Sequence, residues 1–178
     1  PVSSSTLLIS VARAGPVLTD AKTDVARLLL SHGADVNQSA VDSFNPVHCC
    51  AIFPEQSSRG PLIQLFLDAG ANVNATTRQG ETPLAIALGL SVWRYPDPAH
   101  ACLDMITRLL RAGAALDAIR GDNSSIEDLL REEGHRYRES SHYCALEALI
   151  SDVRAAGSTW KAYLRALPKE LLRLRSLV

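Results

Sequence analysis

The sequence lacks any apolar stretch long enough to cross a bilayer, and its first residues show no signal-peptide pattern. Only 5% of the residues are aromatic and 21% are charged. We therefore expect a soluble protein of the cytoplasm or nucleus, with no membrane partner. Because the chain starts with Pro1 and not with Met, we also expect it to be a segment of a longer protein.

Cysteine is scarce, and the four that occur do not have the spacing of a zinc site or of a disulfide framework. They are Cys49, Cys50, Cys102 and Cys144. The histidines show no metal-ligand spacing either. No phosphate-binding glycine loop, Ser-His-Asp order or paired carboxylates stand out. We expect no enzyme activity, metal or cofactor, and reduced cysteines that serve as small packing residues.

Charge of one sign is not in excess, since the formal net charge is -1. The exception is the C-terminal end, where residues 154–175 include six basic residues, from Arg154 to Arg175, and a single acid, Glu170. The interleaved aromatics and glycines typical of nucleic-acid-binding tails are missing there. A solvated helix face explains these charges better, so we do not expect a nucleic-acid partner.

A repeated segment is what the sequence does contain. Each copy begins with apolar residues at helical spacing, continues to a glycine suited to ending a helix, and closes with a short turn such as Ala-Asp-Val-Asn. The copies span residues 25–37, 62–74 and 105–117, with glycines Gly33, Gly70 and Gly113. Repeats at intervals of a few tens of residues indicate a stacked-repeat protein.

A second signature comes eight residues after the final Asn of the first two copies, at 45–51 and 82–88. Asn or Thr can cap the helix that follows, and Pro suits its first turn. The residues concerned are Asn45, Pro46, His48, Thr82, Pro83 and Leu84.

Together these two signatures resemble the ankyrin repeat, in which Thr-Pro-Leu-His opens a first helix and Gly-Ala-Asp-Val-Asn closes a second. The resemblance covers most of residues 3–157 and implies an all-α solenoid of helix–turn–helix units joined by hairpin-like turns. It implies that His48 braces the adjacent turn through backbone hydrogen bonds. It also implies a non-catalytic role in protein–protein recognition, as a scaffold or adaptor.

Four units follow from this alignment, at about 3–37, 38–74, 75–117 and 118–157. They form an array over 1–157, and residues 158–178 form a C-terminal cap. In the fourth unit we expect the first helix to stop at Gly134. In the cap we expect a helix pair separated at Pro168, with leucines packed inward and charges facing water.

The units are longer than the ankyrin standard of about 33 residues. The glycine spacings are 37, 43 and 44 residues, from Gly33 through Gly70 and Gly113 to Gly157. The alignment places the excess between the two helices of each unit. We expect enlarged loops there, at about 16–23, 54–60, 92–100 and 135–142, on the side opposite the turns.

Candidate partner-binding residues lie in one loop and at the turn tips. Trp93, Arg94 and Tyr95 combine three residue types typical of binding anchors, and nearby prolines stiffen their loop. The alternative is that Trp93 covers its own first helix. The turn-tip candidates are Asp42, Phe44, Arg78, Gln79 and Arg120, although Phe44 could instead staple the next helix.

Two other functions remain open. One is the substrate-recognition subunit of a ubiquitin ligase, because Ala166-Leu167-Pro168 resembles the Leu-Pro motif of the helical box that ends some ankyrin proteins. The cysteine expected in such a box is missing from 158–178. The other is a segment that regulates or positions an enzyme in the same, larger protein.

Overall fold

The computed structural model describes residues 4–14, 19–52, 59–93, 100–117, 125–137 and 141–175. Within these ranges every regular element is helical and no strand occurs. The α-helices are α1 (Ser4–Arg13), α2 (Thr19–Ser31), α3 (Pro46–Ala51), α4 (Arg59–Asp68), α5 (Pro83–Trp93), α6 (His100–Arg111), α7 (Ile126–Tyr137), α8 (Ser141–Ala155) and α9 (Trp160–Arg175), and η1 (Val41–Ser43) is a short 3-10 turn.

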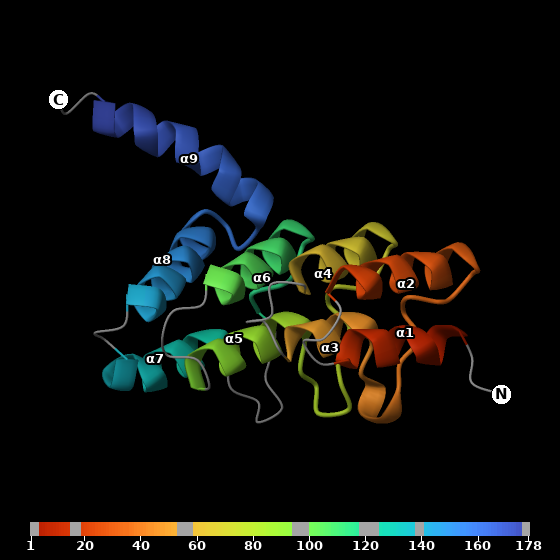
Figure 1. Cartoon of the computed structure of the whole chain (residues 1–178). Coiled ribbons are helices and arrows are strands. Elements are labelled where there is room, and N and C mark those ends of the chain that lie inside the picture. Colours follow the sequence, from red (N-terminus) through yellow and green to blue (C-terminus); the bar gives the residue numbers. More distant parts are fainter. Residues whose placement is uncertain are drawn as a thin grey trace.

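The first eight α-helices form two layers (Figure 1). One layer contains α1, α3, α5 and α7, and each of these helices packs against the next. The other contains α2, α4, α6 and α8, and across the layers α1 packs against α2, α3 against α4, α5 against α6 and α7 against α8. The described chain is therefore an elongated stack of helix pairs in which each pair contacts its neighbours.

Local chemistry explains where these helices begin. Asn45 caps α3, because its side chain accepts the backbone N–H of His48 at 3.0 Å. In the same way, the Thr82 hydroxyl accepts from Ala85 at the start of α5, at 3.3 Å. Such caps satisfy N–H groups that the first turn of a helix leaves without partners.

Glycine explains where the second helices of the pairs end. After α2, α4 and α6 the chain passes through Gly33, Gly70 and Gly113, with φ of 80°, 85° and 94°. In this left-handed region a Cβ would clash with the backbone, so glycine adopts it at least cost.

A continuous apolar core joins the pairs. Its largest fully buried side chains include Phe66 of α4, Leu84 and Leu88 of α5, and Ile106 and Leu109 of α6. Each such side chain contributes about 1.5–3 kcal/mol through removal of its surface from water. The stack is therefore held mainly by contacts between neighbouring pairs.

Two helix boundaries differ from the sequence prediction. The loop expected at about 16–23 is shorter in the structure, because α2 begins at Thr19. We expected the first helix of the fourth unit to stop at Gly134, but α7 continues to Tyr137. Glycine within a helix costs only about 1 kcal/mol relative to alanine, so it permits a stop without imposing one.

The predicted C-terminal helix pair is wrong, because α9 runs through Pro168 as one helix. Proline has a helical φ, and its missing hydrogen bond and steric clash can be accommodated by a bend. The inward packing of leucines is also wrong for two of them, since Leu164 is 49% exposed and Leu167 is 36% exposed. Figure 1 shows α9 starting beside the stack and then leaving it.

Candidate interaction surface

The turns before α3 and α5 have the same closing hydrogen bond. The Ala40 N–H donates to the Phe44 carbonyl at 2.8 Å, and the Thr77 N–H donates to the Glu81 carbonyl at 2.9 Å. At the tip of the second turn, Gly80 has a φ of 82°. The two turns therefore project equivalent hairpin-like tips at the same edge of the stack.

His48 links these two turns from the protein interior. Its Nε2–H donates to the Ala75 carbonyl at 3.0 Å, while its Nδ1 accepts the Asn45 N–H at 3.3 Å. The side chain is fully buried. Burial lowers the pKa of His48, and the backbone carbonyls of Glu81 and Ala75 oppose this effect. The imidazole is therefore held neutral as a brace between two turns.

Two asparagines connect successive units at their second helices. The Asn37 side chain donates to the Gly70 carbonyl at 3.1 Å and accepts the Asn72 N–H at 2.7 Å. Asn74 repeats this pattern one unit later, with Gly113 at 3.1 Å and Ala115 at 2.9 Å. This asparagine ladder fixes the register of three units and holds the turn tips in a row.

The turn tips of the second and third units touch each other. The Arg78 N–H donates to the Asp42 carbonyl at 2.9 Å. The Arg78 guanidinium lies 3.9 Å from the Asp42 carboxylate, with the two side chains 79% and 46% exposed. Such an exposed pair adds little stability. Together with exposed Gln79 these residues form a polar ridge available to a partner.

Beside this ridge lies a shallow apolar groove. Its recess has a volume of about 240 Å³ and is lined by Phe44, Ile52, Glu81, Ala85, Ile86, Gly89 and Leu90. Phe44 packs edge-on against the His48 ring, with centroids 5.6 Å apart. Apart from the nearby backbone of α5 itself, no heavy atom of the described residues lies within 4 Å of the position that a Cβ of Gly89 would occupy. The groove is therefore open at Gly89.

Sequence reasoning identified Phe44 but missed most of this groove. Ile86 and Leu90 belong to α5, whose residues are apolar on almost every side, and Ile52 directly follows the equally apolar end of α3. Periodicity cannot separate their buried face from their surface face. The open position at Gly89 was the available signal, because a glycine inside an apolar helix often marks a place where bulk is avoided.

The loop candidates are placed only in part. Trp93 is the last residue of α5, seven positions after Ile86, and its side chain is not among those described. Arg94, Tyr95 and Arg120 lie outside the described residues. The structure therefore brings together Asp42, Arg78 and Gln79 beside the groove, and the loop residues stay predictions.

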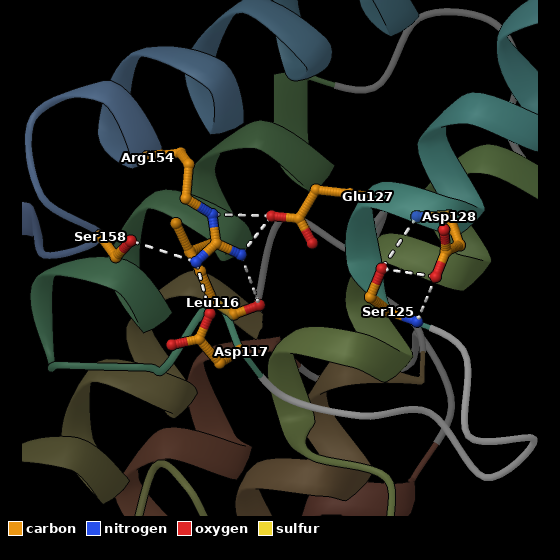
Figure 2. Close-up of polar contacts among 7 residues, drawn as sticks. All are labelled: Leu116, Asp117, Ser125, Glu127, Asp128, Arg154 and Ser158. Atoms are coloured by element: carbon orange, nitrogen blue, oxygen red, sulfur yellow. Dashed lines mark hydrogen bonds and ion pairs between the residues drawn. The ribbon is translucent and has the colours of Figure 1, made fainter.

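The boundary to the fourth unit is built differently, as Figure 2 shows. Asp117 stands where the ladder has Asn37 and Asn74. Its carboxylate accepts from the Arg154 guanidinium, which also binds Glu127, with Nε 2.8 Å from the Glu127 carboxylate. The pKa of Arg154 is raised by its bond to Asp117 and next by its bond to Glu127. An ionic network thus takes over from the asparagine ladder.

A capping box begins α7 next to this network (Figure 2). The Ser125 hydroxyl accepts the Asp128 N–H at 3.1 Å, and the Asp128 carboxylate accepts the Ser125 hydroxyl at 2.7 Å and the Ser125 N–H at 3.1 Å. The Ser125 hydroxyl is the largest cause of the lowered pKa of Asp128, followed by the Ser125 N–H. These are structural roles at a helix start.

Other kinds of site find little support in the described part of the chain. No group of three or more His, Cys, Asp or Glu residues is arranged to hold a metal ion among the residues described. Within the same residues, no helix combines the length and the apolar character required to cross a bilayer.

No family model matches the sequence. Curated proteins similar to part of it include ankyrin repeat and SOCS box protein 6 from Homo sapiens, 41% identical over 69 residues, and the Mus musculus protein of that name, 39% identical over 69 residues. Either alignment covers 38% of this chain and 16% of the relative. BCL-6 corepressor-like protein 1 from Homo sapiens is 34% identical over 73 residues, 41% of this chain and 4% of that protein.

These matches show which class of protein part of the chain resembles. The chain spans only about 16% of the length of the first of these relatives. Over the matched segment the similarity is to ankyrin-repeat proteins, and the described chain is all-helical. None of these relatives' names designates an enzyme.

Proposed function

We propose that the chain is an ankyrin-repeat solenoid that recognises another protein without catalysing a reaction. Its four units span about 3–37, 38–74, 75–117 and 118–157, and residues 158–178 supply a C-terminal helix. The observation that carries the proposal is the apolar groove beside the polar ridge of Asp42, Arg78 and Gln79. Both features lie on rigid, hydrogen-bonded turns and helices.

The dimensions of the groove favour a protein partner. Small-molecule sites usually enclose about 300–1,000 Å³ and bury most of their ligand. The groove is smaller, at about 240 Å³, and open along one side. It suits one apolar side chain of a partner segment, with Glu81 and the ridge available to neighbouring polar groups. Because its walls are preorganised, little ordering entropy opposes binding.

The loop after α5 extends this surface in the proposal. Trp93, Arg94 and Tyr95 begin three positions after the groove-lining residue Leu90. Aromatic residues and arginine are the commonest binding anchors. We assign them, with Arg120 at the next turn, to the outer part of the same interaction surface.

Substituting Gly89 tests the groove with little risk to the fold. Gly89→Leu fills the recess, and in a helix leucine is favoured over glycine by close to 1 kcal/mol. We expect a partner captured from source-cell lysate by the unchanged chain to be lost with Gly89→Leu. Ala148→Leu is the matched control, because it adds the same side chain at an exposed position of α8. A partner retained equally by all three proteins would contradict the groove.

A second candidate is the substrate-recognition subunit of a ubiquitin ligase. It is supported by the term SOCS box in the names of the first relatives. In this chain Leu167-Pro168 lies within α9. The test is whether the full-length protein, purified from its source cell, carries ubiquitin-ligase activity that Leu167→Ala removes. Activity that persists in the Leu167→Ala variant would contradict this candidate.

A further inference from the structure

A second surface lies at the other end of the stack, on α9. The helix begins against the body, where the Trp160 ring lies 5.1 Å from the Tyr163 ring and 5.5 Å from the Arg111 guanidinium. Both aromatic residues are half-buried against the core. The start of α9 is therefore docked on α6 and α8.

Apolar residues continue along one face of α9 beyond its first turn, which is docked on the stack. Leu164 and Leu167 come four and seven residues after Trp160, so they share its helical face. They are nevertheless 49% and 36% exposed. Figure 1 shows that α9 starts beside the stack and then leaves it. Leu171 and Leu174 follow in the same register. An established interface thus runs on into a stripe of which Leu164 and Leu167 are exposed in the described part of the chain.

This stripe borders a recess between α8 and α9. This recess has a volume of about 400 Å³ and is lined by Asp152, Ala155, Ala156, Tyr163, Ala166 and Leu167. Its walls are mostly small or apolar side chains from two helices that diverge. A wedge of this kind admits another helix, because small residues let helix axes approach closely.

Charge decides which kind of helix fits. Over α9 the sequence has five basic residues and one acid, and the bases Lys161 and Arg165 are exposed on the described part of the helix. Pairing with α9 of a second copy would bring two strongly basic helices together. A flat bilayer is also less suitable, because Leu167 of the stripe lines a recess walled by α8 and not a flat face. Acidic flanks on the incoming helix complement the bases.

We propose that the exposed stripe of α9 and the recess beside α8 bind an amphipathic helix of another protein, with leucine-like residues on one face and acidic residues flanking them. This surface is separate from the groove at Phe44 and Ile86, so the protein has two docking sites. Asp152, on the α8 wall, orients the incoming helix with its acids toward α9.

The test uses the whole chain and a fluorescent synthetic helix of roughly 18 residues with a leucine stripe and glutamate flanks. The matched probe has lysine in place of every glutamate. By fluorescence anisotropy we expect the glutamate probe to bind about tenfold more tightly or better, and this difference to shrink at high salt. Equal binding of the two probes, or binding of neither, overturns the proposal.

Variants locate the bound probe. We expect Leu164→Gln/Leu167→Gln to weaken binding by about tenfold or more, since both side chains are exposed and their loss leaves the core intact. Leu28→Gln is the matched control at the opposite end of the stack, where Leu28 is 58% exposed. Equal losses from both variants overturn the proposal.

Two further measurements test the competing occupants with the same variants. One is cosedimentation with phosphatidylglycerol vesicles, and the other is sedimentation equilibrium of the chain alone. We expect neither vesicle binding nor dimerisation that depends on Leu164 and Leu167. Vesicle binding lost in the double variant makes the stripe a membrane contact, and a dimer lost in it makes a second copy the occupant. Either result overturns the proposal.

Discussion

The Asn74 side chain accepts the backbone N–H of Ala115 at 2.9 Å, across the boundary between two helix pairs. The same carboxamide donates to the Gly113 carbonyl at 3.1 Å. One side chain thus satisfies both a donor and an acceptor of the turn that follows the next second helix.

Removing this side chain should weaken the boundary between units. We expect Asn74→Ala to lower the free energy of unfolding by about 1–3 kcal/mol, because two backbone groups lose their partners. Gln38→Ala, at an exposed position, should change it by less than about 0.5 kcal/mol. Chemical denaturation followed by circular dichroism measures both. Equal effects of the two variants would show that the ladder does not stabilise the stack.

The glycine after α4 should tolerate substitution poorly because of its backbone conformation, not because of side-chain crowding. Gly70 has a φ of 85°, and among the described residues nothing beyond its chain neighbours lies within 4 Å of the place of a Cβ. Gly70→Val should therefore cost about 1–2 kcal/mol through left-handed strain. Gly89→Ala, within α5, should instead be neutral or stabilising. Thermal unfolding of the pair checks this, and an unchanged Gly70→Val protein would contradict the helix stop.

Stability should depend on pH through His48. Burial lowers the pKa of His48 from its ordinary value of 6.5, so the folded protein keeps the ring neutral. Below about pH 6.5 the unfolded chain takes up a proton that the folded chain does not. The free energy of unfolding should therefore fall as the pH drops below 6.5, until the pKa of the folded state is passed.

The matched variant isolates this effect from the titration of carboxylates. His48→Gln removes the titrating ring, so its free energy of unfolding should fall less steeply between pH 6.5 and 5. The slopes come from urea denaturation at a series of pH values. Parallel curves for the two proteins would show that His48 does not contribute to the pH dependence.

The contribution of the Arg154 network to stability can be tested by replacing its residues with the leucines found at the equivalent positions of the preceding unit. Arg154 and Glu127 occupy positions equivalent to Leu110 and Leu84, which are buried one unit earlier. Arg154→Leu alone should lower the melting temperature modestly, because it removes the cation shared by two carboxylates that are themselves partly exposed. Adding Glu127→Leu should recover much of the loss. A double variant less stable than Arg154→Leu would contradict this equivalence.

Local chemistry made much of the helical architecture predictable. Asn45, Thr82 and the glycines after the second helices specify starts and stops within a few residues, so sequence alone identifies them. The same reasoning fails at Gly134 and Pro168, where the helices continue. At Gly134 the preference of glycine for a helix stop is too weak to end the helix. At Pro168 a bend can accommodate the proline, so the helix continues.

The interaction surfaces were less predictable, because they depend on contacts between distant segments. Arg154 meets Asp117 across 37 positions and Glu127 across 27, and neither spacing forms a motif. The groove residues Ile86 and Leu90 follow the same apolar pattern as the rest of α5. The pattern does not distinguish buried Ile86 from half-buried Leu90, because their exposure depends on packing against other helices such as α3.

Because Asp117 occupies the position of a third ladder asparagine, the stack has two kinds of boundary between units. The boundaries at Asn37 and Asn74 rest on neutral hydrogen bonds, which dissolved ions scarcely affect. The boundary at Asp117 rests on partly exposed charges, which salt screens. Rising ionic strength therefore loosens the last helix pair first, together with the α9 it carries, while the first three pairs keep their spacing.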